Sequence, residues 1–515
     1  MNKKKFFQNA FLLIFSTLVL RLIFTAFRVV VSNKVGAECM GLYQLTFAVY
    51  NIAATFATSG INFATTRLCA MSLSNSDRPK TKNIVNKSLL YSLVFGISAF
   101  CVIFLFAEPI GEYVLCDKRS VLSLKALAVS LPFISVSSAL SGYFYAEKKV
   151  SVTLLDRAFE QIAQIAAFFI LLSAFPKGSV EQNCLFIVLS GAISEILGSL
   201  FLTAKFAFDN RKIKSSKDRK TLKKVSGTAF SAAASMYLKS GLQTVENILI
   251  PLGFKKYGAN ASQALSGYGI LGSMVMPIIF FPSFVLSSFS MLLVPEFSAS
   301  QAQNKEKDIR SASIITVRLT LLFALFISAN FIVFGRGLGN ALYSEQKAGS
   351  LIKIMAPLIP FMYLDSVADG MLKGLGEYNK VIKYSTIDTV VSILLIFFVI
   401  PKTGLYGYVL VIYVSSILNA FLSIRRLLVV TKNKIRVFSD ITVPFSASLF
   451  SAVCVKSLFP SHLFSKTAVV TISLCLSSLL TLAFIMISKG RMYESVKYAV
   501  DTVRAAVFKS NFRKG

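Results

Sequence analysis

Predominantly apolar stretches of roughly 20 residues recur along the chain and restrict its fold more than any other feature. Clear examples are residues 12–31, 89–107, 319–334 and 469–487. A helix of about 20 apolar residues crosses the roughly 30 Å hydrocarbon layer of a bilayer with its backbone hydrogen bonds satisfied internally. Only 15% of residues are charged, whereas soluble domains typically have about 25%. We therefore predict an all-α, polytopic membrane protein.

We predict about fourteen transmembrane helices. Their expected spans are residues 8–31, 41–63, 87–108, 121–145, 153–175, 184–207, 227–252, 265–294, 312–335, 350–372, 382–401, 405–428, 440–459 and 467–488.

The connections between these spans alternate in charge. Most of the 55 Lys and Arg residues lie in every second connection, and the richest stretch is residues 205–224. Positively charged connections stay on the cytoplasmic side. Adding or removing one helix would invert every later connection and destroy this alternation. The pattern therefore predicts fourteen helices with both termini cytoplasmic.

The same sequence argues against several other classes of protein. The net charge of +31 would suit nucleic-acid binding, but no long basic face or aromatic-basic module is present. The seven cysteines lack the spacing of a metal site. No connection is long enough to fold as a catalytic domain with an acidic pair. We expect no enzyme, no cofactor, no metal and no nucleic-acid partner.

Weak internal similarity predicts two related lobes. Lys34-Val-Gly-Ala37 parallels Lys256-Tyr-Gly-Ala259, the segment 143–156 parallels 376–388, and Pro176-Lys-Gly178 parallels Pro401-Lys-Thr-Gly404. Parallel repeats of this kind place a binding cavity near the midplane between two lobes. The expected organisation is a lobe of helices 1–6 (1–210), a basic cytoplasmic linker (211–226), a second lobe of helices 7–12 (227–430), and helices 13–14 with a basic tail (431–515).

Ionisable residues within the spans are candidates for the substrate site, because charges inside a membrane are costly. Helix 1 carries Arg21 and Arg28, and helix 7 carries Lys239 and Glu246; in each pair a separation of seven places both residues on one face. Polar neighbours are expected to line the same cavity. These neighbours are Asn51, Gln243 and Asn247.

Each assignment has a structural alternative. Arg28 is also placed to extend its charge to the outer interface, and Lys239 and Glu246 are also placed to form a structural ion pair. Glu160, Glu195 and Asp388 are expected to be packing or interfacial groups. Arg21 lies deeper than Arg28 and favours an anionic substrate, since the guanidinium group binds phosphate oxygens in a bidentate manner.

Two segments resemble a known family. Residues 35–70 resemble its helix 1–2 region, and residues 246–298 match it more specifically, through Tyr268-Gly269, Met276-Pro277, Pro282 and Leu293-Val-Pro-Glu296. The family is the polysaccharide transporter family, and the similarity is to its stage V sporulation protein B branch. Gly142-Tyr-Phe, Glu160-Gln161 and Pro401-x-x-Gly404 extend the resemblance over nearly the whole chain.

This resemblance implies the fold of the multidrug/oligosaccharidyl-lipid/polysaccharide flippase superfamily. Relatives move lipid II or other undecaprenyl-pyrophosphate sugars across the bacterial cytoplasmic membrane. Arg21 stands where lipid II flippases place a cavity arginine, whereas Ala53, Ala54 and Thr55 occupy the region of their helix 2 arginine pair.

The function expected from the resemblance is therefore flipping of a lipid-linked oligosaccharide, with membrane lipids as the other partners. The alternative is a cation-coupled exporter of small molecules with the same fold. That exporter would depend on Glu246, Asp365 and Asp369.

Overall fold

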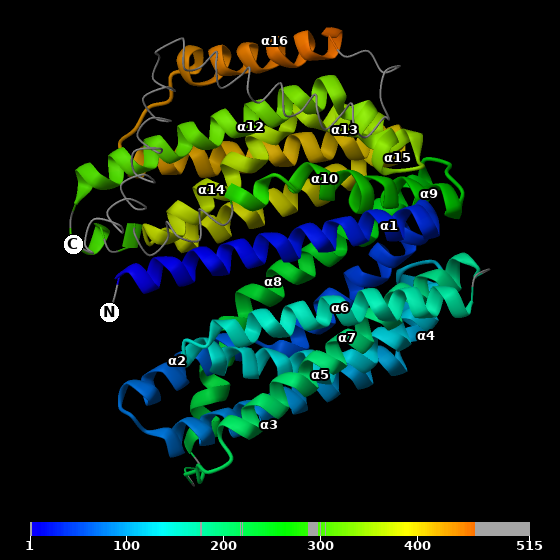
Figure 1. The fold of residues 1–515 in the computed structure, drawn as a ribbon. Coiled ribbons are helices and arrows are strands. Elements are labelled where there is room, and N and C mark those ends of the chain that lie inside the picture. Colours follow the sequence, from blue (N-terminus) through cyan, green and yellow to red (C-terminus); the bar gives the residue numbers. More distant parts are fainter. Residues whose placement is uncertain are drawn as a thin grey trace. The chain divides into compact units, whose positions relative to one another are not determined.

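A computed structural model of the protein describes residues 3–175, 178–216, 218, 220–286, 297–298, 300–303 and 305–458, with side chains from residue 16 to residue 457. The part of the chain so described contains helices and no strands (Figure 1). The predicted all-α membrane fold is confirmed.

The described helices follow one another along the chain. They are α1 (Lys3–Thr58), α2 (Ile61–Ser74), α3 (Arg78–Leu105), α4 (Ala107–Pro109), η1 (Ile110–Val114), α5 (Ser120–Ala146), α6 (Val150–Ala174), α7 (Val180–Asp209), α8 (Lys220–Lys256), α9 (Ala261–Gly269), η2 (Ile270–Val275), α10 (Met276–Phe280), α12 (Glu306–Leu342), α13 (Gln346–Met355), η3 (Ala356–Leu358), α14 (Ile359–Gly374), α15 (Tyr378–Val430), η4 (Phe438–Thr442) and α16 (Val443–Leu458).

Nine helical segments among the described residues are long and apolar enough to cross a membrane. The count of fourteen is compatible with these helices and stays a prediction. The last predicted span (467–488) and the basic tail lie outside the described residues. The same holds for the Leu293-Val-Pro-Glu296 motif and for Pro176 and Lys177.

Two predicted connections are kinks within long helices rather than loops. In α1 the backbone breaks at Gly36 (φ 82°, ψ 170°), and in α15 it breaks at Gly404 (φ 61°, ψ −135°). Glycine reaches both conformations because it lacks a Cβ atom. Each long helix therefore holds two of the predicted spans.

Local backbone geometry repeats where the sequence repeats. The turn after α5 places Lys148 at positive φ, and the turn after α14 places Gly376 there. The hydrogen bonds match as well: the amide of Lys149 donates to Phe144 O, and that of Glu377 donates to Leu372 O. Gly36 and Gly258, in the first pair of similar segments, also share a positive φ. These turns support the internal repeat at the level of local structure.

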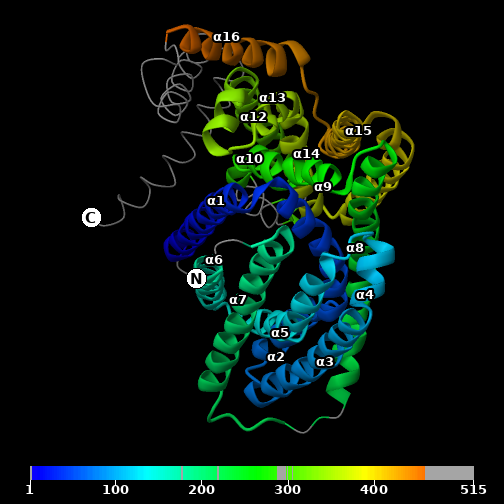
Figure 2. The same ribbon diagram turned by 90° about the vertical axis from the view of Figure 1, so that its right-hand side faces the viewer.

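The chain forms two compact units. Of the described residues, those within 15–269 and 400–404 form the N-terminal unit, and the others form the C-terminal unit. In the N-terminal unit α5 packs against α2, α3 and α7, while α8 packs against α2 and α3 (Figure 2). In the C-terminal unit α12 packs against α13, α14 and α16. The division falls after Gly269 rather than at the basic linker, so the lobe boundaries predicted from the sequence stay a prediction.

Candidate functional site

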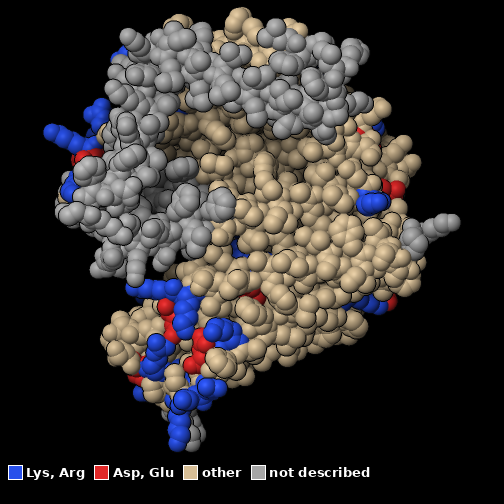
Figure 3. Space-filling model, in the orientation of Figure 1, with Lys and Arg blue, Asp and Glu red and all other residues tan. Residues whose placement is uncertain are grey.

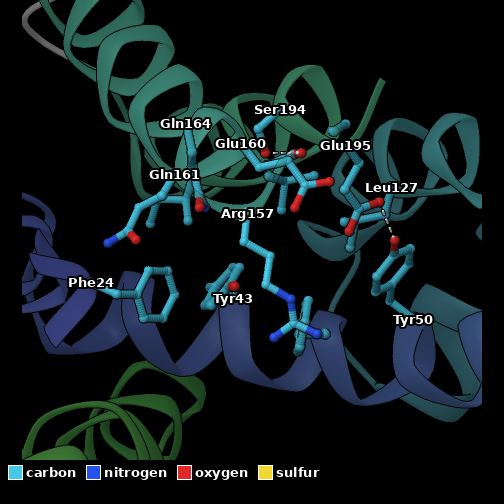
Figure 4. Close-up of a pocket in the computed structure, with 15 residues that line it drawn as sticks. Phe24, Tyr43, Tyr50, Leu127, Arg157, Glu160, Gln161, Gln164, Ser194 and Glu195 are labelled. Atoms are coloured by element: carbon cyan, nitrogen blue, oxygen red, sulfur yellow. Dashed lines mark hydrogen bonds between the residues drawn. The ribbon is translucent and has the colours of Figure 1, made fainter. Parts of the chain in front are cut away.

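A pocket of about 380 Å³ opens within the N-terminal unit between α1, α5, α6 and α7 (Figure 4). The helices that surround it are predominantly apolar, yet the pocket combines ionisable, amide and aromatic groups. Its lining residues are Phe24, Tyr43, Phe47, Tyr50, Leu127, Arg157, Glu160, Gln161, Gln164, Ile187, Val188, Gly191, Ala192, Ser194 and Glu195. Polar groups at membrane depth are costly, so their concentration here makes the pocket the candidate functional site.

One wall of the pocket is aromatic. Tyr43, Phe47 and Tyr50 lie at helical spacing on one face of α1. The ring centroids of Tyr43 and Phe47 lie 5.5 Å apart, and those of Phe47 and Tyr50 lie 5.4 Å apart. Phe24, from the part of α1 before the kink, extends this surface (Figure 4). The rings form a continuous apolar face.

The opposite wall is polar and comes mainly from α6. Arg157, Glu160, Gln161 and Gln164 follow the i, i+3, i+4, i+7 pattern that places side chains on one helical face. Figure 4 shows the Arg157 side chain extending from α6 toward α1. The Glu160 carboxylate lies directly over Gly198 on α7, where a Cβ atom would come within 2.3 Å of Glu160 Oε1. Gly198 is therefore required for this placement.

Some of these polar groups are already paired. The Tyr50 hydroxyl donates to Glu195 Oε2 at 2.7 Å and also contacts Ser130 Oγ at 2.8 Å. Gln161 Nε2 donates to the carbonyl of Leu20 at 2.9 Å. By contrast, no side-chain hydrogen bond or ion pair joins Arg157, Glu160 or Gln164 to any other described residue. These three groups remain able to bind a ligand.

The predicted residues of helix 1 lie close to this pocket. Arg21 and Arg28 are both half-buried on α1. The guanidinium groups of Arg21 and Arg157 are near enough to repel each other electrostatically, and Arg28 interacts electrostatically with the pocket residue Tyr43. The structure thus brings an unpredicted arginine of α6 near Arg21 and places Arg28 near the pocket residue Tyr43.

The other predicted residues lie along the contact between α1 and α8. Ser240 Oγ donates to the carbonyl of Asn51 at 3.4 Å, and Thr244 Oγ1 donates to that of Ala48 at 3.0 Å. Lys239 and Gln243, adjacent to these two α8 residues, are exposed, as is Asn51.

Glu246 is half-buried on α8, and its neighbour Asn247 accepts a hydrogen bond from Tyr268 at 3.0 Å. That all seven predicted residues line one cavity stays a prediction.

The sequence analysis did not identify Arg157, and it predicted that Glu160 and Glu195 are packing or interfacial groups. Arg157 follows Asp156 near the beginning of a predicted span, and a charged residue there is expected to lie at the membrane interface rather than in a substrate site. The available signal was the single polar face formed by residues 157, 160, 161 and 164 in an otherwise apolar helix.

Charged residues also gather at one end of the N-terminal unit (Figure 3). Glu147, only 3% exposed, forms ion pairs with Arg78 and with Lys149 at 2.8 Å. Lys149 also pairs with Asp209 at 2.9 Å, and Lys205 pairs with Asp209 at 2.8 Å. Burial acts to raise the pKa of Glu147, but hydrogen bonds from Lys149 and Arg78 outweigh it and hold that pKa below its ordinary value. This Glu147 cluster fixes the ends of α3, α5 and α7.

A separate acidic group lies in the C-terminal unit. Asp365 and Asp369 on α14 accept hydrogen bonds from Asn419 at 2.8 Å and Ser423 at 3.1 Å, both on α15. The described residues contain no group of three or more His, Cys, Asp or Glu side chains placed to hold a metal ion.

Taken together, the helices and the polar pocket define a multi-pass α-helical membrane transporter. Residues 6–301 match the family of polysaccharide biosynthesis proteins, and the chain belongs to that family. Residues 236–398 also match the MatE family.

Curated relatives agree with this assignment. The chain is 26% identical to stage V sporulation protein B of Bacillus subtilis (strain 168) over 434 residues, which cover 82% of this chain and 83% of that protein. It is 23% identical to the lipid II flippase MurJ of the same organism over 461 residues, with coverage of 82% and 83%. The resemblance predicted from the sequence is confirmed.

Solved structures share the fold. A lipid II flippase MurJ in an inward closed conformation aligns with a TM-score of 0.71 at 14% identity, over 92% of this chain and 97% of that one. An inward-facing multidrug resistance MATE family transporter aligns with a TM-score of 0.62 at 14% identity, over 81% of this chain and 100% of that one.

Proposed function

We propose that the protein flips an undecaprenyl-pyrophosphate-linked sugar precursor across the bacterial cytoplasmic membrane by alternating access. The relatives named as a lipid II flippase and as a sporulation protein support a substrate of the peptidoglycan or spore-cortex type. The protein makes and breaks no covalent bond in this process, so it is not an enzyme.

The observation that carries this proposal is the contact of α6 with α1 directly before Arg21. Gln161 Nε2 on α6 donates to the carbonyl of Leu20 at 2.9 Å, and Arg157, one helical turn before Gln161, interacts electrostatically with Arg21. Two guanidinium groups that repel each other inside a membrane protein are stabilised by an anion that bridges them. A pyrophosphate offers several oxygens to such a pair, and each guanidinium can bind two of them in parallel. Arg28 and the exposed Lys239 supply further positive charge on α1 and α8.

The orientation follows from the charge pattern. The connection between α7 and α8 is rich in Lys and Arg, and we place it and both termini in the cytoplasm. The membrane potential, negative inside, then drives an anionic headgroup outward by about 2.3 kcal/mol per charge per 100 mV.

A second candidate function is cation-coupled export of small molecules. The hydrogen-bonded carboxyls of Asp365 and Asp369 and the match to the MatE family favour it. An exporter of this kind would lose transport when Asp365 is changed to Asn and would not need Arg21.

Complementation tests the proposal. The wild-type chain and an Arg21→Ala variant are expressed in a bacterium depleted of its own lipid II flippases, and their insertion is checked by immunoblotting of membranes. We expect growth with the wild type and none with Arg21→Ala, because the variant loses a contact with the pyrophosphate. Equal rescue by both proteins would refute the arginine site. Absence of rescue by well-inserted wild type would exclude lipid II as the substrate, and an Asp365→Asn drug-efflux assay would then examine the exporter.

A further inference from the structure

We infer that the pocket between α1, α6 and α7 binds a neutral sugar ring of the lipid-linked headgroup, next to Arg21 and Arg157, which hold the pyrophosphate. This inference rests on the proposed function and assigns part of the substrate to a specific place. The pocket volume of about 380 Å³ lies at the small end of ligand sites and suits one N-acetylated hexose unit better than a whole headgroup.

The aromatic wall fits the apolar side of a sugar. A hexose ring presents C–H groups on its faces, and these pack against aromatic rings. Tyr43, Phe47 and Tyr50 form a row along α1 with neighbouring centroids about 5.5 Å apart, long enough to cover such a face.

The polar wall fits the hydroxyl groups. A hydroxyl both donates and accepts, so it pairs with a carboxylate, an amide or a guanidinium group. Glu160 and Gln164 offer a carboxylate and an amide, and no other described residue occupies either group with a hydrogen bond or ion pair. Glu195, held by Tyr50 at 2.7 Å, adds a fixed acceptor at the end of the row.

Other occupants fit the pocket less well. An apolar molecule such as the prenyl chain would leave each of these polar groups unpaired, at a cost of about 1–3 kcal/mol per group. A phosphate would face the carboxylates of Glu160 and Glu195. A neutral polyhydroxylated ring with an amide substituent satisfies both walls.

The pocket also lies next to the proposed phosphate site. Gln161, a pocket residue, donates to the carbonyl of Leu20, directly before Arg21. Arg157 contributes to the pocket and interacts electrostatically with Arg21. A sugar linked directly to a pyrophosphate held by Arg21 is therefore within reach of the pocket.

Gly191 offers a direct way to fill the pocket. A Cβ atom at Gly191 would meet Gln164 Nε2 at 3.7 Å, an ordinary van der Waals contact. The backbone at Gly191 therefore accepts a Cβ atom, and the longer side chain of Gly191→Leu extends into space that the sugar needs. Gln164→Leu is a second variant, in which the amide that would hydrogen-bond to the sugar is replaced by an apolar side chain of similar size. Glu108→Gln changes an exposed residue outside the pocket, paired with Lys125, and is the control for general effects of mutation and purification.

The experiment measures binding by the purified full-length protein in lipid nanodiscs. The probes are undecaprenyl pyrophosphate, undecaprenyl-pyrophosphoryl N-acetylglucosamine and lipid II. We expect wild type and Glu108→Gln to prefer the two sugar-bearing lipids. Gly191→Leu and Gln164→Leu should lose about tenfold in affinity for these two and keep their affinity for undecaprenyl pyrophosphate. Arg21→Gln should weaken the binding of all three lipids by a similar factor.

The outcomes separate the two proposals. Binding of all three lipids with no sugar preference in wild type, or a preference that Gly191→Leu and Gln164→Leu retain, would overturn the sugar pocket and leave the flippase proposal standing. Failure of wild type to bind any of the three lipids would overturn the flippase proposal and the sugar pocket with it.

Discussion

Single residues determine how the ends of the transmembrane helices are joined. Glu147 is nearly buried although it is charged, and Arg78 and Lys149 compensate for its lost hydration. In a second cluster, Arg119 donates to Glu38 and Asp117, while Ser262 donates to Glu38 at 2.6 Å. Each cluster joins connections that are distant in the sequence, so a change of one carboxylate affects several helices.

We predict that Glu147→Gln lowers the free energy of unfolding in detergent by about 2 kcal/mol, because charge-assisted hydrogen bonds from two cations are lost. The pKa of Glu147 lies below its ordinary value in the folded protein, so its contribution is present at neutral pH and disappears as the pH falls through that lowered pKa. Thermal unfolding at pH 7 and at progressively acidic pH measures both effects. Glu108→Gln, at an exposed pair, should change little. A Glu147→Gln protein as stable as wild type at pH 7 would contradict the prediction.

We also predict that Arg157→Gln weakens binding of undecaprenyl pyrophosphate by about tenfold or more, since one charge-assisted contact with the phosphate is lost. Arg157→Lys should recover only part of that affinity, because an ammonium group cannot form the bidentate contact. Titration of the lipid into protein in nanodiscs measures the loss. Unchanged affinity in Arg157→Gln would remove this residue from the phosphate site.

At the scale of elements, close helix contacts depend on glycine. A Cβ atom at Gly41 on α1 would lie 2.0 Å from the carbonyl oxygen of Leu265 on α9, and one at Gly269 would lie 2.1 Å from that of Ala37. Backbone atoms cannot move aside as a flexible side chain can. Small residues at such contacts allow membrane helices to approach closely.

We predict that Gly41→Ala destabilises the protein by about 2 kcal/mol or more, because α1 and α9 must separate to admit the methyl group. Gly227→Ala, on α8, is the matched control, because a Cβ atom at this position would meet nothing within 4 Å. Alanine stabilises a helix relative to glycine by about 1 kcal/mol, so this variant should be as stable as wild type or more stable. Thermal unfolding and size-exclusion chromatography of both variants provide the comparison. Equal loss of stability in the two variants would show that the close contact does not matter.

At the scale of the whole molecule, the arrangement of charge determines how the chain inserts. The basic connection after α7 and the connection before α5 lie at opposite ends of membrane-spanning helices, separated by α5, α6 and α7. We expect these three helices to cross the membrane, and an odd number of crossings would put the two connections on opposite sides.

We predict that Lys118→Cys is labelled by a membrane-impermeant maleimide in intact cells, whereas Lys212→Cys is labelled only after permeabilisation. Both positions are exposed. The background carries Cys101→Ser and Cys116→Ser, because these two native cysteines are exposed. Labelling of Lys212→Cys in intact cells would reverse the proposed orientation.

The sequence by itself determined the membrane-spanning class, the positions of the described helices and the family. The length of apolar segments and the charge of the connections between them are local properties of the chain. The thickness of the bilayer and the charge bias of its two sides constrain both in any membrane protein, so they can be recognised in the sequence. The pocket required the tertiary structure. Arg157, Glu160 and Gln164 form one side of a pocket only because α6 packs against the aromatic residues of α1. Likewise, the proposed phosphate site needs Arg157 of α6 near Arg21 of α1. Periodicity shows which face of a helix is polar, but packing decides which other helix that face meets.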